Sequence, residues 1–156
     1  MKPIDADQAY WVRAHWRRWR DYDKFLDNPK DDHAYLYAIW GRFGSSARLL
    51  YVGKIYNQYA GFRIAQKDRA RRRKTMLRRY PRHRLVVSLG EVEMSYGGKV
   101  TRSRVGEVER LLIFANRPDL NRQNLQTHGA QRAYVIENTG SFGTMYRQLH
   151  FGLFGG

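Results

Sequence analysis

Apolar and aromatic residues recur at helical spacing between Ala9 and Leu26. At about 100° per residue, an α-helix over this stretch gathers its large apolar side chains on one arc. Those side chains are Trp11, Trp19, Tyr22, Phe25 and Leu26, and the opposite stripe carries Arg13, Arg17, Arg20 and Lys24. The pattern predicts an amphipathic helix packed on the core. Its basic stripe is either a solvated face or a contact with phosphate.

Two short runs of aromatic and aliphatic residues follow, at residues 33–40 (HAYLYAIW) and 48–53 (RLLYVG). Runs of this composition and length are typical of β-strands. Residues 41–47 between them read GRFGSSA, and glycine and serine favour turns. The sequence therefore predicts two neighbouring antiparallel strands.

The rest of the chain mixes helical and extended patterns. Residues 57–80 favour an interrupted helix that Pro81 ends, because their apolar positions do not keep to one stripe. Residues 84–94 (RLVVSLGEVEM) alternate apolar and polar positions and predict a third strand. Residues 106–115 predict a compact helix and residues 132–138 a further strand. The glycine-rich residues 139–156 give no assignment.

Length and composition limit the classes of protein that fit. A chain of 156 residues with 42% hydrophobic residues suits one domain with one core. It contains no cysteine, which excludes disulfides and thiolate metal sites. The longest apolar run, AYLYAIW, is too short to span a membrane, and the first ten residues lack the apolar core of a secretory signal. We therefore expect an intracellular, cytoplasmic protein with no membrane partner.

Charge changes the picture most. The chain has 29 lysines and arginines against 14 acidic residues, a net charge of +15. Between residues 63 and 84, eleven positions are basic and only Asp68 is acidic. Such a field attracts polyanions, and we expect nucleic acid, with an anionic membrane or a ribosomal assembly as alternatives. The candidate phosphate-binding residues are Arg69, Arg71, Arg72, Arg73, Lys74, Arg78, Arg79, Arg82 and Arg84.

An ordered set of motifs runs through the middle of the chain. YLYAI (35–39) ends the first strand, LLYVGK (49–54) ends the second, an arginine follows at residue 63, and EVERLLIFANRPDLN covers residues 107–121. This order resembles the GIY-YIG nuclease family, although YLY stands in place of GIY. The resemblance covers about residues 35–124. The site residues it implies are Tyr37, Tyr51, Lys54, Arg63, Glu109 and Asn121.

These residue types suit phosphodiester hydrolysis. The reaction needs a deprotonated water in line with the leaving oxygen, and positive charge on the oxygens that become more negative. Glu109 would hold one Mg²⁺ ion (or Mn²⁺), which needs few protein ligands. Arg63 and Lys54 would contact phosphate, and either Tyr37 or Tyr51 would take the proton from water. The choice between the two tyrosines stays open.

Two further assignments rest on the same motifs. Glu107 also has apolar neighbours on the helix, and only the spacing to Pro118 and Asn121 favours Glu109 as the metal ligand. Asn121 either supports the site through hydrogen bonds or caps a turn.

The resulting expectation is an α/β (α+β) domain with a small, mainly antiparallel three-stranded sheet flanked by helices, as in the GIY-YIG family. Residues 1–32 would form an N-terminal helical extension, 33–128 the nuclease core, and 129–156 a C-terminal strand and tail. The expected function is a metal-dependent DNA endonuclease, as a homodimer if it cuts both strands of a symmetric site. The alternative is a noncatalytic nucleic-acid-binding protein that keeps the fold and the charge.

Overall fold

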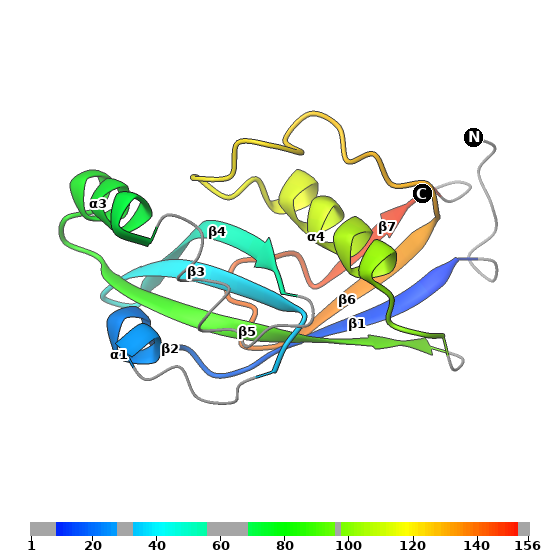
Figure 1. Cartoon of the computed structure of the whole chain (residues 1–156), viewed down its shortest axis with the longest axis horizontal. Coiled ribbons are helices and arrows are strands. Elements are labelled where there is room, and N and C mark those ends of the chain that lie inside the picture. The colour runs from blue at the N-terminus through cyan, green and yellow to red at the C-terminus, as the bar shows by residue number, and fades with distance from the viewer. Residues whose placement is uncertain (1–8, 28–32, 56–68, 96–97, 153–156) are drawn as a thin grey trace.

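The structure is a computed structural model and describes residues 9–27, 33–55, 69–95 and 98–152. Its strands are β1 (Tyr10–Trp16), β2 (Arg20–Asp21), β3 (Leu36–Phe43), β4 (Ser46–Lys54), β5 (Arg84–Met94), β6 (Tyr134–Gly140) and β7 (Gln148–Phe151). Its helices are α1 (Tyr22–Asp27), α3 (Arg69–Arg79) and α4 (Arg102–Asn116). The strands form one curled sheet, and the helices lie outside it (Figure 1).

The expected three-stranded, mainly antiparallel sheet is wrong, because the residues that the structure describes form a mixed sheet of seven strands. Its order is β4-β3-β5-β1-β6-β7, with β2 also paired to β5. β1 pairs in parallel with β6, whereas the other pairs are antiparallel. The predicted strands β3, β4 and β5 are neighbours in this sheet, but β1, β6 and β7 extend it beyond β5. The strand β7 lies in the glycine-rich stretch that gave no assignment.

The predicted helix from Ala9 to Leu26 is also wrong. Residues 10–16 form β1, in which Val12, Ala14 and Trp16 are buried and Arg13 and His15 are exposed. This is the two-residue period of a strand with one face on the core. β1 lies between β5 and β6, so its hydrogen-bonding partners come from distant parts of the chain. Helix is found only at the end of the stretch, in α1.

Other local predictions are confirmed. Residues 84–94 form β5, and β3 and β4 form an antiparallel hairpin. The predicted helix 106–115 is part of α4, which begins earlier because the Thr101 side chain accepts a hydrogen bond from the Arg104 N–H at 3.2 Å and caps the helix. In the predicted helical stretch 57–80, α3 covers Arg69–Arg79, and residues 57–68 lie outside the described residues.

The helices cover both faces of the sheet. On one face, Val105, Val108 and Leu112 of α4 pack with side chains such as Leu36 and Trp40 of β3. On the other face, α1 and α3 pack with the alternate side chains of the same strands, among them Tyr37 and Ile39 of β3. The central strands are therefore buried on both faces. Within the described ranges, no helix combines the length and apolar character needed to cross a bilayer.

Candidate active site

The candidate site lies at the free edge of the sheet, where β4 is the last strand. After α4 the chain runs beside β4, and the Leu120 N–H donates to the Leu50 carbonyl at 2.8 Å. Asn121 continues this pairing with its buried side chain. Its Oδ1 accepts from the Val52 N–H at 2.9 Å, and its Nδ2 donates to the Val52 carbonyl at 3.0 Å. The side-chain amide of Asn121 thus bonds the Val52 N–H and carbonyl in the way that the backbone of a neighbouring strand would. Asn121 is therefore a positioning residue for the backbone next to Tyr51.

Gly53 makes room for Tyr37. The two residues are opposite each other in the β3–β4 ladder. A Cβ atom on Gly53 would lie 2.4 Å from Tyr37 Cζ and 2.6 Å from its hydroxyl oxygen, so the Tyr37 ring covers the Gly53 backbone. The Tyr51 ring lies 5.8 Å from the Tyr37 ring, at an interplanar angle of 30°. The glycine therefore lets a tyrosine of the buried strand β3 reach the sheet edge beside Tyr51.

These residues line a pocket of about 430 Å³, which we call the tyrosine pocket. Five of the six residues that the motifs implied as catalytic line it, and they are Tyr37, Tyr51, Lys54, Glu109 and Asn121. The sixth, Arg63, lies outside the described residues. Side chains from two strands, from α4 and from the segment after α4 thus meet in one polar cavity.

Helix α4 places the carboxylate of this pocket. A Cβ atom on Gly106 would lie 3.5 Å from Lys54 Nζ, so the ammonium group at the end of β4 lies against this turn of α4. Glu109 follows Gly106 by three residues, a spacing that puts both on the same side of a helix. Lys54 and Glu109 therefore reach the tyrosine pocket from neighbouring elements.

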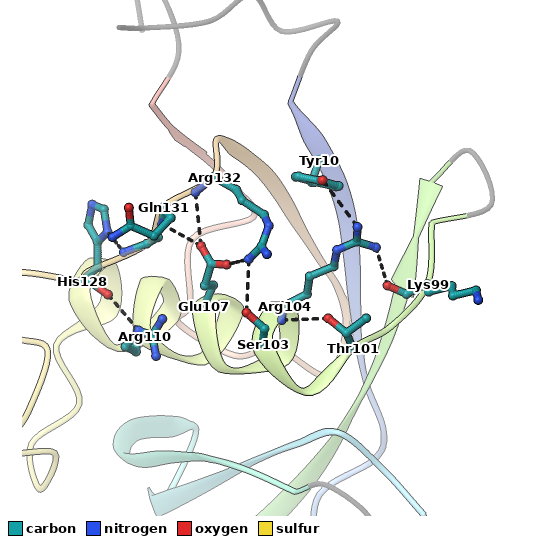
Figure 2. Close-up of polar contacts among 11 residues, drawn as sticks. Tyr10, Lys99, Thr101, Ser103, Arg104, Glu107, Arg110, His128, Gln131 and Arg132 are labelled. Carbon is teal, nitrogen blue, oxygen red and sulfur yellow. Dashed lines mark hydrogen bonds and ion pairs between the residues drawn. The ribbon is translucent and has the colours of Figure 1, made fainter. Parts of the chain in front are cut away.

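Glu107, the competing acidic residue, has a different environment. Its side chain is buried, with 2% of the residue exposed. Its carboxylate accepts hydrogen bonds from the backbone N–H of Gln131 at 2.8 Å and of Arg132 at 3.2 Å, and it forms an ion pair with the Arg132 guanidinium (Figure 2). Glu107 thus ties α4 to the segment before β6. The structure separates two acidic residues that the sequence could distinguish only by spacing.

A second pocket, of about 460 Å³, adjoins the first and is called here the arginine pocket. Its arginines are Arg71, Arg72, Arg78 and Arg79 of α3 and Arg122. Tyr51, Leu120 and Arg122 line both pockets, which makes the two cavities neighbours. The Arg72 guanidinium carbon lies 4.1 Å from the centre of the Tyr51 ring, a cation–π contact.

Asp119, the acidic residue of the arginine pocket, is already engaged. It forms an ion pair with Arg48 and accepts a hydrogen bond from the Tyr80 hydroxyl at 2.6 Å. Burial and this hydrogen bond raise the pKa of Tyr80 above its usual value. Arg48 therefore offsets the negative charge of Asp119, and the pocket keeps its basic character.

The predicted phosphate-binding residues are not equivalent. Arg73 bonds Asp23 of α1 at 2.9 Å, and this hydrogen bond raises the pKa of Arg73. Arg84 lies 3.5 Å from Asp21, so both arginines have acidic partners within the molecule. Lys74 and Arg82 are exposed, and Arg69 is the first residue of α3. The arginine pocket thus contains only part of the predicted set.

Sequence reasoning missed Arg122, an exposed residue that lines both pockets. Its position directly after Asn121 was the available signal, because the motif that places Asn121 at the sheet edge also places its neighbour there.

No protein-family model matches the chain, and no curated protein or solved structure is significantly similar to it.

Proposed function

We propose that this protein is a divalent-metal-dependent DNA endonuclease that hydrolyses phosphodiester bonds in the tyrosine pocket. The observation that carries the proposal is the meeting of Tyr37, Tyr51, Lys54 and Glu109 in one cavity beside a pocket lined by arginines. These residues come from three elements, and their order along the chain resembles that of the GIY-YIG nucleases. A protein that only binds nucleic acid has no need for a carboxylate among phosphate-binding groups.

The donor set fits Mg²⁺ or Mn²⁺. Glu109 contributes a half-buried carboxylate to a polar pocket that Gln123 and Asn124 also line. Among the described residues, no three His, Asp or Glu side chains gather as a protein cage for a metal ion. A single carboxylate suits an ion that keeps several of its waters, which is the preference of Mg²⁺. When bound, such an ion stabilises the negative charge that develops on the phosphate oxygens.

The chain's own groups supply the other requirements. Lys54 places an ammonium charge at the end of β4, where it can contact a non-bridging phosphate oxygen. Tyr37 and Tyr51 place two phenol groups in the same cavity, and one of them accepts the proton of the attacking water. Asn121 acts through Val52 and holds β4 in register with the segment after α4. Arg63 retains its proposed role as a phosphate ligand.

Glu109→Gln tests the proposal, because it keeps the size of the side chain and removes its negative charge. We expect nicking of supercoiled plasmid to fall by at least roughly 10³-fold across a Mg²⁺ titration, since the metal no longer has its protein ligand. Binding of a short duplex in Ca²⁺ and the thermal midpoint should change little. Glu93→Gln is the matched control, because Glu93 is an exposed carboxylate of β5 outside both pockets.

Glu107 is unsuitable as a control, because its carboxylate is buried and ion-paired. Plasmid cleavage by Glu109→Gln at the wild-type rate would contradict the proposal. A wild-type protein that binds the duplex but cuts with neither Mg²⁺ nor Mn²⁺ would identify a noncatalytic nucleic-acid-binding protein instead.

A further inference from the structure

Arg72 has a buried nitrogen without a hydrogen-bond partner. Its NH1 atom is inaccessible to solvent, and no acceptor for it lies within the described residues. The guanidinium carbon is held 4.1 Å from the centre of the Tyr51 ring. A buried N–H group without an acceptor is unfavourable, and such groups are rare in folded proteins. The arrangement is therefore suited to a ligand that brings an acceptor.

The surroundings of Arg72 favour an anionic ligand. Of the described residues, five arginines and one acidic residue, Asp119, line the arginine pocket, and Asp119 is already paired with Arg48. A pocket for an uncharged small molecule is lined mostly by apolar and aromatic side chains, with few polar groups. Guanidinium groups match phosphate oxygens in both charge and geometry.

The position of the arginine pocket indicates which phosphate it takes. Tyr51, Leu120 and Arg122 form a wall common to both pockets. The proposed path takes a nucleic-acid strand from a phosphate in the tyrosine pocket across this wall. On that path the next phosphate would enter the arginine pocket, where Arg72 and Arg122 are among the lining residues.

We propose that the arginine pocket is a second phosphate subsite, which binds the backbone phosphate next to the scissile one through Arg72 and Arg122. This inference rests on the proposed nuclease function, because that function defines the scissile phosphate. For this contact the Arg72 guanidinium turns over the Tyr51 ring, so that NH1, which is closed to solvent in this structure, faces a phosphate oxygen in the pocket. Lysine cannot reproduce this contact, since an ammonium group has neither the planar face nor the rigid fork of donors.

The subsite is tested by measuring how tightly DNA binds to variants that keep the positive charge at Arg72 (Arg72→Lys) or remove it (Arg72→Gln). The assay is binding of a short fluorescent DNA duplex in Ca²⁺, measured over a range of salt concentrations. Arg72→Gln and Arg72→Lys should each weaken binding by roughly tenfold or more, as expected for a lost hydrogen bond to a charged group. Arg122→Gln should also weaken it. For Arg72→Gln, the slope of log affinity against log salt should decrease by about 0.9 for the lost phosphate contact.

Arg13 supplies the matched controls, Arg13→Gln and Arg13→Lys. This arginine is exposed on β1 and lies opposite Glu93 and Glu137 on the neighbouring strands, so phosphate is not expected there. Both control variants should bind the duplex as the wild type does. Thermal melts of every variant exclude unfolding as the cause of weaker binding.

The position of the subsite is tested by replacing single phosphates with uncharged methylphosphonates around a mapped cut. Replacement next to the cut should slow wild-type cleavage, and Arg72→Gln should show no further loss at that position. The subsite would be overturned if Arg72→Lys bound the duplex with wild-type affinity, or if the Arg72 and Arg13 variants lost affinity equally. The basic residues would then attract DNA only through their overall positive charge. If the Arg72 variants bind more weakly but the wild type does not cut DNA, the arginine pocket still binds phosphate. The proposed nuclease function would then be refuted. Absence of wild-type binding would overturn both proposals.

Discussion

Gly53→Ala is the sharpest structural test of the candidate site. The added Cβ would lie 2.4 Å from Tyr37 Cζ, 2.5 Å from Cε1 and 2.6 Å from the hydroxyl oxygen. Real Cβ contacts are essentially never shorter than 3.0 Å, so either the ring or strand β4 must move. Tyr37 is only 1% exposed, so any turn of its ring disturbs the side chains packed around it.

The size of the effect follows from two opposing terms. Overpacking a closely packed interior costs about 1–3 kcal/mol. Replacing a glycine within a strand recovers roughly 0.5–1 kcal/mol, because alanine has less backbone freedom to lose on folding. We expect a net loss of about 1–2 kcal/mol in the free energy of unfolding. For a chain of this size, each kcal/mol lowers the thermal midpoint by roughly 2–4 °C.

Gly106→Ala is the matched control, because Gly106 lies against Lys54, which lines the same pocket as Tyr37. The nearest atom to its added Cβ is Lys54 Nζ at 3.5 Å, an ordinary contact with a flexible side chain. Because Gly106 lies within α4, alanine should stabilise the protein by about 0.5–1 kcal/mol. The two substitutions add the same methyl group and are expected to have opposite signs.

Urea denaturation followed by far-UV circular dichroism measures both effects. A double-mutant cycle identifies the cause, since in the Tyr37→Leu background the ring is gone and Gly53→Ala should cost little. The reasoning is refuted if Gly53→Ala matches the wild type in stability, or if its cost is the same in the Tyr37→Leu background.

Four other substitutions test individual side chains. Asn121→Ala leaves the Val52 N–H without its acceptor and should lower the free energy of unfolding by about 1–3 kcal/mol in urea titrations; an unchanged value would contradict the positioning contact. Burial raises the pKa of Tyr134, so the folded state favours the neutral phenol. The resulting contribution to stability is present below pH ~10 and is lost as the pH rises through the pKa of the folded state. Tyr134→Phe should therefore flatten the decline of the thermal midpoint above pH ~10 without loss at neutral pH, and an equally steep decline would count against this origin. Of Tyr37→Phe and Tyr51→Phe, at least one should slow plasmid nicking by on the order of 10²-fold or more, and wild-type rates in both would exclude a tyrosine base.

Local patterns in the sequence determined several elements of the fold. The alternation over 84–94 identified β5, the glycine- and serine-rich loop identified the β3–β4 hairpin, and residues 106–115 identified most of α4. Each of these signals lies within one element. β1 was misread because its aromatic and basic residues also fit a helical period. Its true period is enforced by pairing with β5 and β6, and no local signal carries that pairing.

For the site, residue types and order were readable from the sequence, but three decisions needed the tertiary structure. Burial and the Arg132 ion pair assign Glu107 to packing and leave Glu109 in the tyrosine pocket. Asp23 of α1 pairs with Arg73, whereas Arg72 has a buried nitrogen for which the described residues offer no acceptor.

The third decision was the meeting of Tyr37 and Glu109. A tyrosine of a buried strand shares a pocket with the carboxylate of a distant helix because Gly53 leaves space above β4 and Asn121 holds the returning chain against β4. Sequence spacing determines which side chains are present. Burial, pairing and steric room between distant segments determine which of them can act together.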